Sequence, residues 1–196
     1  MKNENVLCVE LTPLQKTFPL ERRFWQTEAA VLDGLDYGFA PRSEAERDFT
    51  RKQIIPYALL FDGQGRVLTY RRHGSEGRLA GRYSAGIGGH VNDHDVGTTL
   101  SDRLLSGLTR EMREETGFGP GPGQFRFLGM INEDESEVGR CHIGAVFLVE
   151  LNASRSLTFS GEIAEPAWRS AAELDLSRFE LWSALALRLA AEQKEV

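Results

Sequence analysis

The sequence of 196 residues has few cysteines, no long apolar run and no excess of positive charge. Its two cysteines, Cys8 and Cys141, lie far apart without the spacing of a metal site, which predicts reduced thiols rather than a disulfide framework. No apolar run approaches the ~20 residues that span a bilayer, and the first five residues are not followed by the apolar core of a signal peptide. A net charge of -6 disfavours a general nucleic-acid or membrane binder. We expect a cytoplasmic protein with a small-molecule substrate.

The length favours one domain with an extension, and a hydrophobic content of 41% is sufficient for a sizeable core. We expect residues 1–52 to form an N-terminal extension and residues 53–196 to form the main domain. Phe18 and Trp25 belong to an aromatic-rich part of the extension that should pack on the main domain. Such an arm would also suit packing across a homodimer interface.

Apolar runs and turn residues predict the elements. Strands are expected at 6–11, 54–61, 66–72, 125–131 and 141–151, and helices at 21–35, from about Thr98 to Thr116, and at 181–193. Asp62-Gly63-Gln64-Gly65 is a turn that makes residues 54–72 a β-hairpin. Gly117 should end the central helix.

The central helix carries an unusual set of acids. Glu111, Glu114 and Glu115 stand at positions i, i+3 and i+4, so they share one face. At about 100° per residue, Glu115 falls inside the apolar arc, Glu111 on its border and Glu114 just outside it. A solvated acidic patch should lie on the polar face, so this placement favours a partly enclosed site. Crowded carboxylates suit a hard divalent cation such as Mg²⁺ or Mn²⁺.

Other candidate site residues lie in loops and at strand ends. The glycine-rich segment 85–90 exposes backbone groups, and Arg71 and Arg72 could hold an anion or simply form a solvated strand edge. An acidic segment that contains Glu137 joins two predicted strands, from where it could reach a site or form a charged hairpin tip. The two aspartates and the histidine of the loop at 93–95 could bind a metal, but an isolated Asp-His-Asp in a loop is usually solvated.

These residues together resemble the Nudix box, Gly-x5-Glu-x7-Arg-Glu-U-x-Glu-Glu-x-Gly-U, where U is a bulky apolar residue. The match consists of Gly89 and the run from Arg110 to Phe118, which fits every fixed position of the second half of the box. With Glu137 to Gly139 downstream, the chain resembles a group of predicted Nudix phosphoesterases. The resemblance implies an α/β fold, an α/β/α sandwich around a mixed sheet over residues 53–190, with an N-terminal α/β extension.

Two departures from the pattern concern the first half of the box. Arg110 lies 21 positions after Gly89, whereas the pattern places the arginine 14 positions after the glycine, so seven residues are inserted. Counting back from Arg110 places the first acid at Asp102, to which we assign no catalytic role. We expect the insertion in the loop 92–99, which would lengthen a loop rather than the helix.

The resemblance implies a metal-dependent hydrolase that cleaves a phosphoanhydride bond in a nucleoside diphosphate linked to another group, or in a nucleoside triphosphate. Mg²⁺ or Mn²⁺ would be held by the Gly89 carbonyl, Glu111, Glu114 and Glu115. The expected catalytic residues are Glu111, Glu137 and Arg110, and the expected substrate contacts are Arg71, Arg72, His90 and His142. A nucleotide-binding sensor without catalysis is one alternative. An enzyme like isopentenyl diphosphate isomerase, with Cys141 as its thiol, is another.

Overall fold

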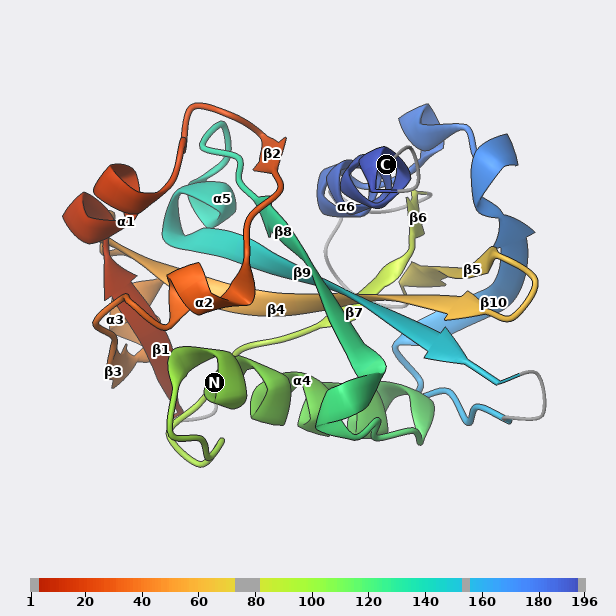
Figure 1. Cartoon of the computed structure of the whole chain (residues 1–196), viewed down its shortest axis with the longest axis horizontal. Coiled ribbons are helices and arrows are strands. Elements are labelled where there is room, and N and C mark those ends of the chain that lie inside the picture. Colours follow the sequence, from red (N-terminus) through yellow and green to blue (C-terminus); the bar gives the residue numbers. More distant parts are fainter. Residues whose placement is uncertain (1–3, 73–81, 153–155, 194–196) are drawn as a thin grey trace.

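The longest strand, β4 (Arg51–Asp62), runs through the centre of a mixed sheet (Figure 1). The computed structural model describes residues 4–72, 82–152 and 156–193. β4 pairs in parallel with β9 (His142–Leu151) and antiparallel with β5 (Arg66–Arg72), and the sheet follows the order β10-β5-β4-β9-β8-β2. Residues 52–61 of β4 are all buried, as the near-continuous apolar run predicts for a strand covered on both faces.

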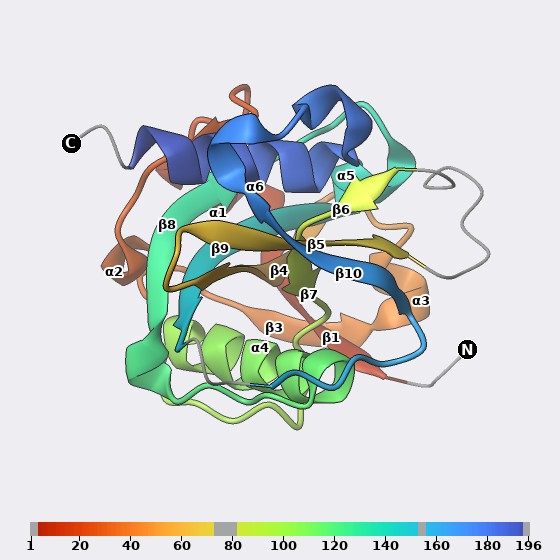
Figure 2. The same ribbon diagram turned by 90° about the vertical axis from the view of Figure 1, so that its right-hand side faces the viewer.

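Helix α4 (Leu100–Thr116) covers one face of this sheet and helix α6 (Leu181–Glu192) covers the other (Figures 1 and 2). Successive β4 side chains point to opposite faces. Ile54, Ala58 and Leu60 therefore join the core under α4, whereas Tyr57, Leu59 and Phe61 join the core under α6. The mixed α/β sandwich expected from the resemblance is confirmed.

Shorter strands complete the sheet around β4. β5 pairs with β10 (Ile163–Ser170) and with β6 (Tyr83–Ser84), and β7 (Gly86–Gly88) pairs with β4. β8 (Phe125–Ile131) pairs with β9. The remaining short elements are α5 (Glu137–Cys141), η1 (Pro122–Gln124), η2 (Ala171–Glu173) and η3 (Leu176–Arg178).

The first 52 residues contribute strands to the same sheet. Their elements are β1 (Asn5–Glu10), α1 (Leu11–Thr17), β2 (Phe24–Trp25), α2 (Ala29–Leu32), β3 (Gly38–Pro41) and α3 (Arg42–Ala45). β1 pairs with β4, and β2 pairs with β8. Phe18 and Trp25 are buried in the core under α4, as expected.

The helix predicted over residues 21–35 is wrong. Residues 24–25 instead form β2 against Met130 and Ile131, and only residues 29–32 are helical. Pairing with β8 is a long-range contact, and it overrides the local helical pattern in this segment.

Candidate functional site

Helix α4 is fixed at both ends by cap residues. The Thr99 side chain accepts a hydrogen bond from the Asp102 amide, and the Asp102 carboxylate reaches back to the amides of Thr98 and Thr99. Gly117 closes the helix with a left-handed φ of 68°. Asp102 is exposed and serves as an N-terminal cap, so its shorter side chain fits a structural role.

The three acids of the helix differ in exposure as their angular positions predict. Glu115 is 9% exposed, the side chain of Glu111 is 18% exposed and that of Glu114 is 62% exposed. Glu115 and Glu111 are therefore enclosed by protein, and Glu114 extends toward solvent. This gradient places the acids at an edge between core and water, where a soluble ligand can reach them.

Gly89 lies directly against Glu111. A Cβ at position 89 would sit 2.3 Å from Glu111 Cδ, so only glycine permits this close approach. The structure thus brings together two of the residues that the sequence assigned to metal binding.

Arg110 is the centre of an ion-pair network. Its Nε and Nη2 donate to the two carboxylate oxygens of Asp95 at 3.0 and 2.9 Å. Its Nη1 donates to Glu111 Oε1, and its Nη2 also donates to the carbonyl of His90 at 2.8 Å. Arg110 therefore ties the glycine-rich segment, the following loop and the Glu111 carboxylate into one unit.

Asp95 is the residue that sequence reasoning missed. It is 4% exposed, its Oδ2 accepts from the Asn92 amide at 3.0 Å, and it packs over Gly107, where a Cβ would lie 3.0 Å from Oδ2. The close packing expected beside Gly107 is present, and its partner is a carboxylate.

The position of Asp95 corrects the expected location of the insertion. Five residues separate Gly89 from Asp95, which satisfies the Gly-x5-acid half of the Nudix box without a gap. The seven extra residues therefore lie between Asp95 and Arg110, in and before the first turns of α4. Glu111, Glu114 and Glu115 all follow the added residues, so their spacing along the helix is unchanged. Counting forward from Gly89 would have found this position.

Burial raises the pKa of Glu111, and the hydrogen bond and charge of Arg110 oppose that rise. The same contacts with Asp95 and Glu111 raise the pKa of Arg110 further, so its guanidinium stays charged. A partly desolvated carboxylate held by a fixed cation is a suitable proton acceptor.

Glu137 lies in the first turn of α5, and its side chain is exposed. The loop before it is rigidly built, because the Glu133 carboxylate accepts hydrogen bonds from the amides of Glu135 and Ser136 and from the Ser136 hydroxyl. The buried ammonium of Lys52 donates to Asp134 Oδ1 and to the carbonyls of Gly139 and His142.

His90 and His142 are brought together, with their Nε2 atoms 3.2 Å apart. His142 Nδ1 lies 2.7 Å from the carbonyl of Val138, which can only accept, so this nitrogen carries the proton. His142 Nε2 then accepts from His90 Nε2. Desolvation by burial lowers the pKa of His90 to about 3 and also lowers that of His142. Both rings are therefore neutral at pH 7, which suits contact with an uncharged group.

The structure describes the side chain of only one of the two strand arginines, Arg71. Leu68 and Tyr70 belong to the core under α4, whereas Val67 belongs to the core under α6. By alternation, Arg71 points to the α6 face, away from Glu111. Arg72 pairs with Ile163 of β10, and its side chain lies outside the described residues.

The donor set around α4 fits a hard divalent cation in its chemistry. It consists of carboxylates and a backbone carbonyl, and Glu111 already lies against Gly89. Within residues 4–72, 82–152 and 156–193, no three His, Cys, Asp or Glu side chains converge on one point. Glu111 Oε1 accepts a hydrogen bond from Arg110, which holds the carboxylate in place beside Gly89.

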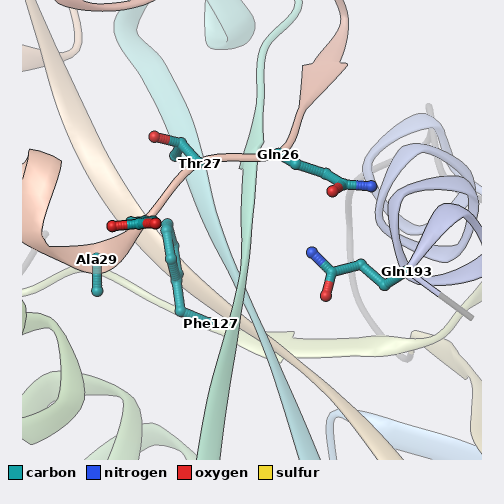
Figure 3. Close-up of a pocket in the computed structure, with 6 residues that line it drawn as sticks. Gln26, Thr27, Ala29, Phe127 and Gln193 are labelled. Atoms are coloured by element: carbon teal, nitrogen blue, oxygen red, sulfur yellow. The ribbon is translucent and has the colours of Figure 1, made fainter. Parts of the chain in front are cut away.

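Three other features lie outside this site. An open hollow of about 480 Å³ between α2, β8 and the end of α6 is lined by Gln26, Thr27, Glu28, Ala29, Phe127 and Gln193 (Figure 3). None of these residues belongs to the site around α4.

Cys141 is 1% exposed, its thiol donates to the Glu46 carbonyl, and burial raises its pKa, which does not suit a nucleophile. In the described part of the chain, no helix has the length and apolar character needed to cross a membrane.

Several known proteins resemble this chain over most of its length. The family model of the NUDIX domain matches residues 52–190. The crystal structure of Tm1382, a candidate Nudix hydrolase, is 32% identical, with a TM-score of 0.77 over 98% of this chain and 100% of that chain. The structure of the MutT protein from Methanosarcina mazei Go1 is 27% identical, with a TM-score of 0.55 over 72% of this chain and 94% of that chain.

Protein YmaB of Bacillus subtilis (strain 168) is 32% identical over 150 residues, which is 72% of each chain. Because Tm1382 matches nearly the whole chain, it shares the N-terminal segment as well as the region around α4.

Proposed function

Because this chain belongs to the Nudix hydrolase family, we propose that it is a metal-dependent hydrolase of a phosphoanhydride bond. The substrate class is a nucleoside diphosphate linked to another group, or a nucleoside triphosphate. The observation that carries this proposal is the unit formed by Asp95, Arg110, Glu111 and Gly89. It places a partly buried carboxylate against a glycine backbone and fixes it with an arginine.

Each residue of this unit has a distinct task. Asp95 fixes the guanidinium of Arg110, and Arg110 orients Glu111 and the backbone at His90. Gly89, Glu111, Glu114 and Glu115 would hold Mg²⁺ or Mn²⁺. When bound, such an ion neutralises charge that builds up on phosphate oxygens and makes water more acidic.

Glu111 and Glu137 are the candidates for the general base. Glu111 has the raised pKa and the fixed position that proton removal from water requires. Glu137 is exposed on a short helix that Lys52 and Glu133 hold in place, so its carboxylate is accessible to water.

Glu114→Gln tests this assignment, because it removes a charged metal ligand and keeps the shape of the side chain. We expect metal-dependent hydrolysis of nucleotides to fall by at least about a hundredfold, a loss of about 2.7 kcal/mol in transition-state stabilisation. Glu192→Gln, an exposed change in α6, is the matched control and should retain full activity. Undiminished metal-dependent hydrolysis by Glu114→Gln would refute the assignment.

A further inference from the structure

Three arginines from three different elements surround the ring of Tyr83 in β6. The guanidinium carbons of Arg71 (β5), Arg169 (β10) and Arg178 (η3) lie 4.6, 5.0 and 5.3 Å from the ring centroid. We call these four residues the Tyr83 cluster. β5, β6 and β10 are neighbours in the sheet, and η3 reaches them because Phe179 bridges to Tyr83 (Figure 2).

Within residues 4–72, 82–152 and 156–193, the acids that pair with the cluster neutralise only part of its positive charge. Arg71 pairs with Glu165, whose side chain is 71% exposed. Arg169 donates to the neutral Thr69 hydroxyl at 3.1 Å. In the part of the chain that the structure describes, neither Arg169 nor Arg178 forms an ion pair. Hydrogen bonds from Ser177 are the main reason that the pKa of Asp175 is lowered, and the charge of Arg178 adds a smaller effect. Both arginines are exposed to solvent.

This concentration of charge does not follow from the overall composition, because the chain has a net charge of -6. Each cation–π contact with Tyr83 stabilises a guanidinium by only about 0.5–1 kcal/mol at an exposed site. The hydrogen bond and charge of Arg71, with the charges of Arg169 and Arg178, lower the pKa of the Tyr83 phenol. The local field thus favours a negative charge at this point.

The cluster lies on the other side of the sheet from the acids of α4. Arg71 and Arg169 follow the alternation that places Val67 and Thr69 toward α6, and Tyr83 packs against the core under α6. Glu111 instead packs on Gly89 beneath the opposite face. The two sites therefore have opposite charge and separate positions.

We propose that the Tyr83 cluster binds a phosphoryl group at a site separate from the acids of α4. Arginine is suited to this task because its planar fork donates to two phosphate oxygens at once, and Tyr83 spaces the three forks around one point. The phosphoryl group has two sources, the far end of a long substrate or a free inorganic phosphate. Both present the same anionic oxygens to the cluster.

The test is pyrophosphate binding by calorimetry in the presence of a chelator, where the acids of α4 repel the anion. In the double variant Arg169→Gln with Arg178→Gln, we expect about tenfold or greater weakening. The matched control is Arg22→Gln with Arg47→Gln, which removes the same charge from exposed positions elsewhere. Because salt screens distant charges, the affinity of this control for pyrophosphate should change by less than about threefold. Equal weakening in both double variants, or no binding by the wild type, would overturn the proposal.

Two further measurements separate the sources and the functions. A raised KM with unchanged kcat in the cluster variant assigns the site to the substrate, whereas an unchanged KM with lost pyrophosphate binding assigns it to a free anion. Glu114→Gln should still bind pyrophosphate in chelator, so a failure of the hydrolase proposal is distinguishable from a failure of this one. Unfolding midpoints confirm that the variants are folded.

Discussion

Asp95→Asn tests whether the buried carboxylate before α4 organises the site. The side chain keeps its size but loses its charge, and its two bonds to Arg110 are no longer charge-assisted on both sides. Breaking a buried ion pair costs about 3–5 kcal/mol. Because the Arg110 side chain is 30% exposed, water recovers part of this loss, and we expect destabilisation of about 2–3 kcal/mol.

The same change should reduce kcat. In this variant the guanidinium of Arg110 keeps its bonds to Glu111 and to the His90 carbonyl but loses the charge that anchors it, so the Glu111 carboxylate is held less tightly. A displacement of about 1 Å at a reacting group costs up to about a hundredfold in rate. We therefore expect a loss in kcat of about tenfold to a hundredfold, measured with any nucleotide that the wild type hydrolyses, and a lower urea midpoint.

Asp102→Asn is the control for this prediction. Counting back from Arg110 singles out Asp102, whereas the structure makes it an exposed helix cap. Asp102 is the N3 residue of the capping box, and an asparagine oxygen there can still accept from the Thr98 and Thr99 amides. Stability should therefore change by less than about 1 kcal/mol, and kcat should not change. If Asp102→Asn lowers kcat as strongly as Asp95→Asn, or if Asp95→Asn leaves stability unchanged, the reasoning is refuted.

Three further predictions concern protonation and close packing. The folded pKa of His90 is depressed to about 3 from about 6.5 in the unfolded chain, so the unfolded chain takes up the proton first. The free energy of unfolding, measured by urea titration, should fall as the pH drops below about 6.5 and should be lower by about 2 kcal/mol at pH 5. A free energy of unfolding that does not change with pH in this range would contradict the prediction. Burial raises the pKa of Cys8 to about 11, so iodoacetamide should label it only after unfolding, and rapid native labelling would refute that. Gly89→Ala puts a Cβ 2.3 Å from the Glu111 carboxyl carbon and should lower kcat at least about tenfold. The control Gly63→Ala meets no atom within 4 Å and should leave kcat unchanged. Equal kcat values for the two variants would argue against the contact between Gly89 and Glu111.

The elements that sequence alone predicts well are those whose pattern is set locally. Residues 125–131 alternate and contain β-formers, and β8 has these bounds. The helix with its Gly117 stop and its buried Glu115 was also predicted, because the 100° repeat of a helix determines which side chains meet the core. The order of exposure of the three acids followed from the same geometry.

The features that the sequence did not reveal depend on contacts between distant segments. Residues 24–25 join the sheet only because the edge of β8 is available to them. β10 is absent from the predicted strands, because its strand character comes from pairing with β5. The contact between His90 and His142 likewise requires both strand ends to meet.

Asp95 shows how one alignment choice hides a site residue. Its position in a polar loop favoured solvation, and only the fold shows that Arg110 bonds to both of its carboxylate oxygens. The second half of the box appeared intact because the seven inserted residues all precede Arg110.

The central claim is metal-dependent phosphoanhydride hydrolysis at α4. The most direct measurement is the release of phosphate or nucleoside monophosphate from a panel of nucleoside triphosphates, nucleotide sugars and dinucleotides, with Mg²⁺, with Mn²⁺ and with a chelator. The account predicts that at least one class is hydrolysed with metal and that the chelator and Glu111→Gln both abolish the reaction. Binding of these nucleotides without hydrolysis of any of them, under all metal conditions, would contradict it.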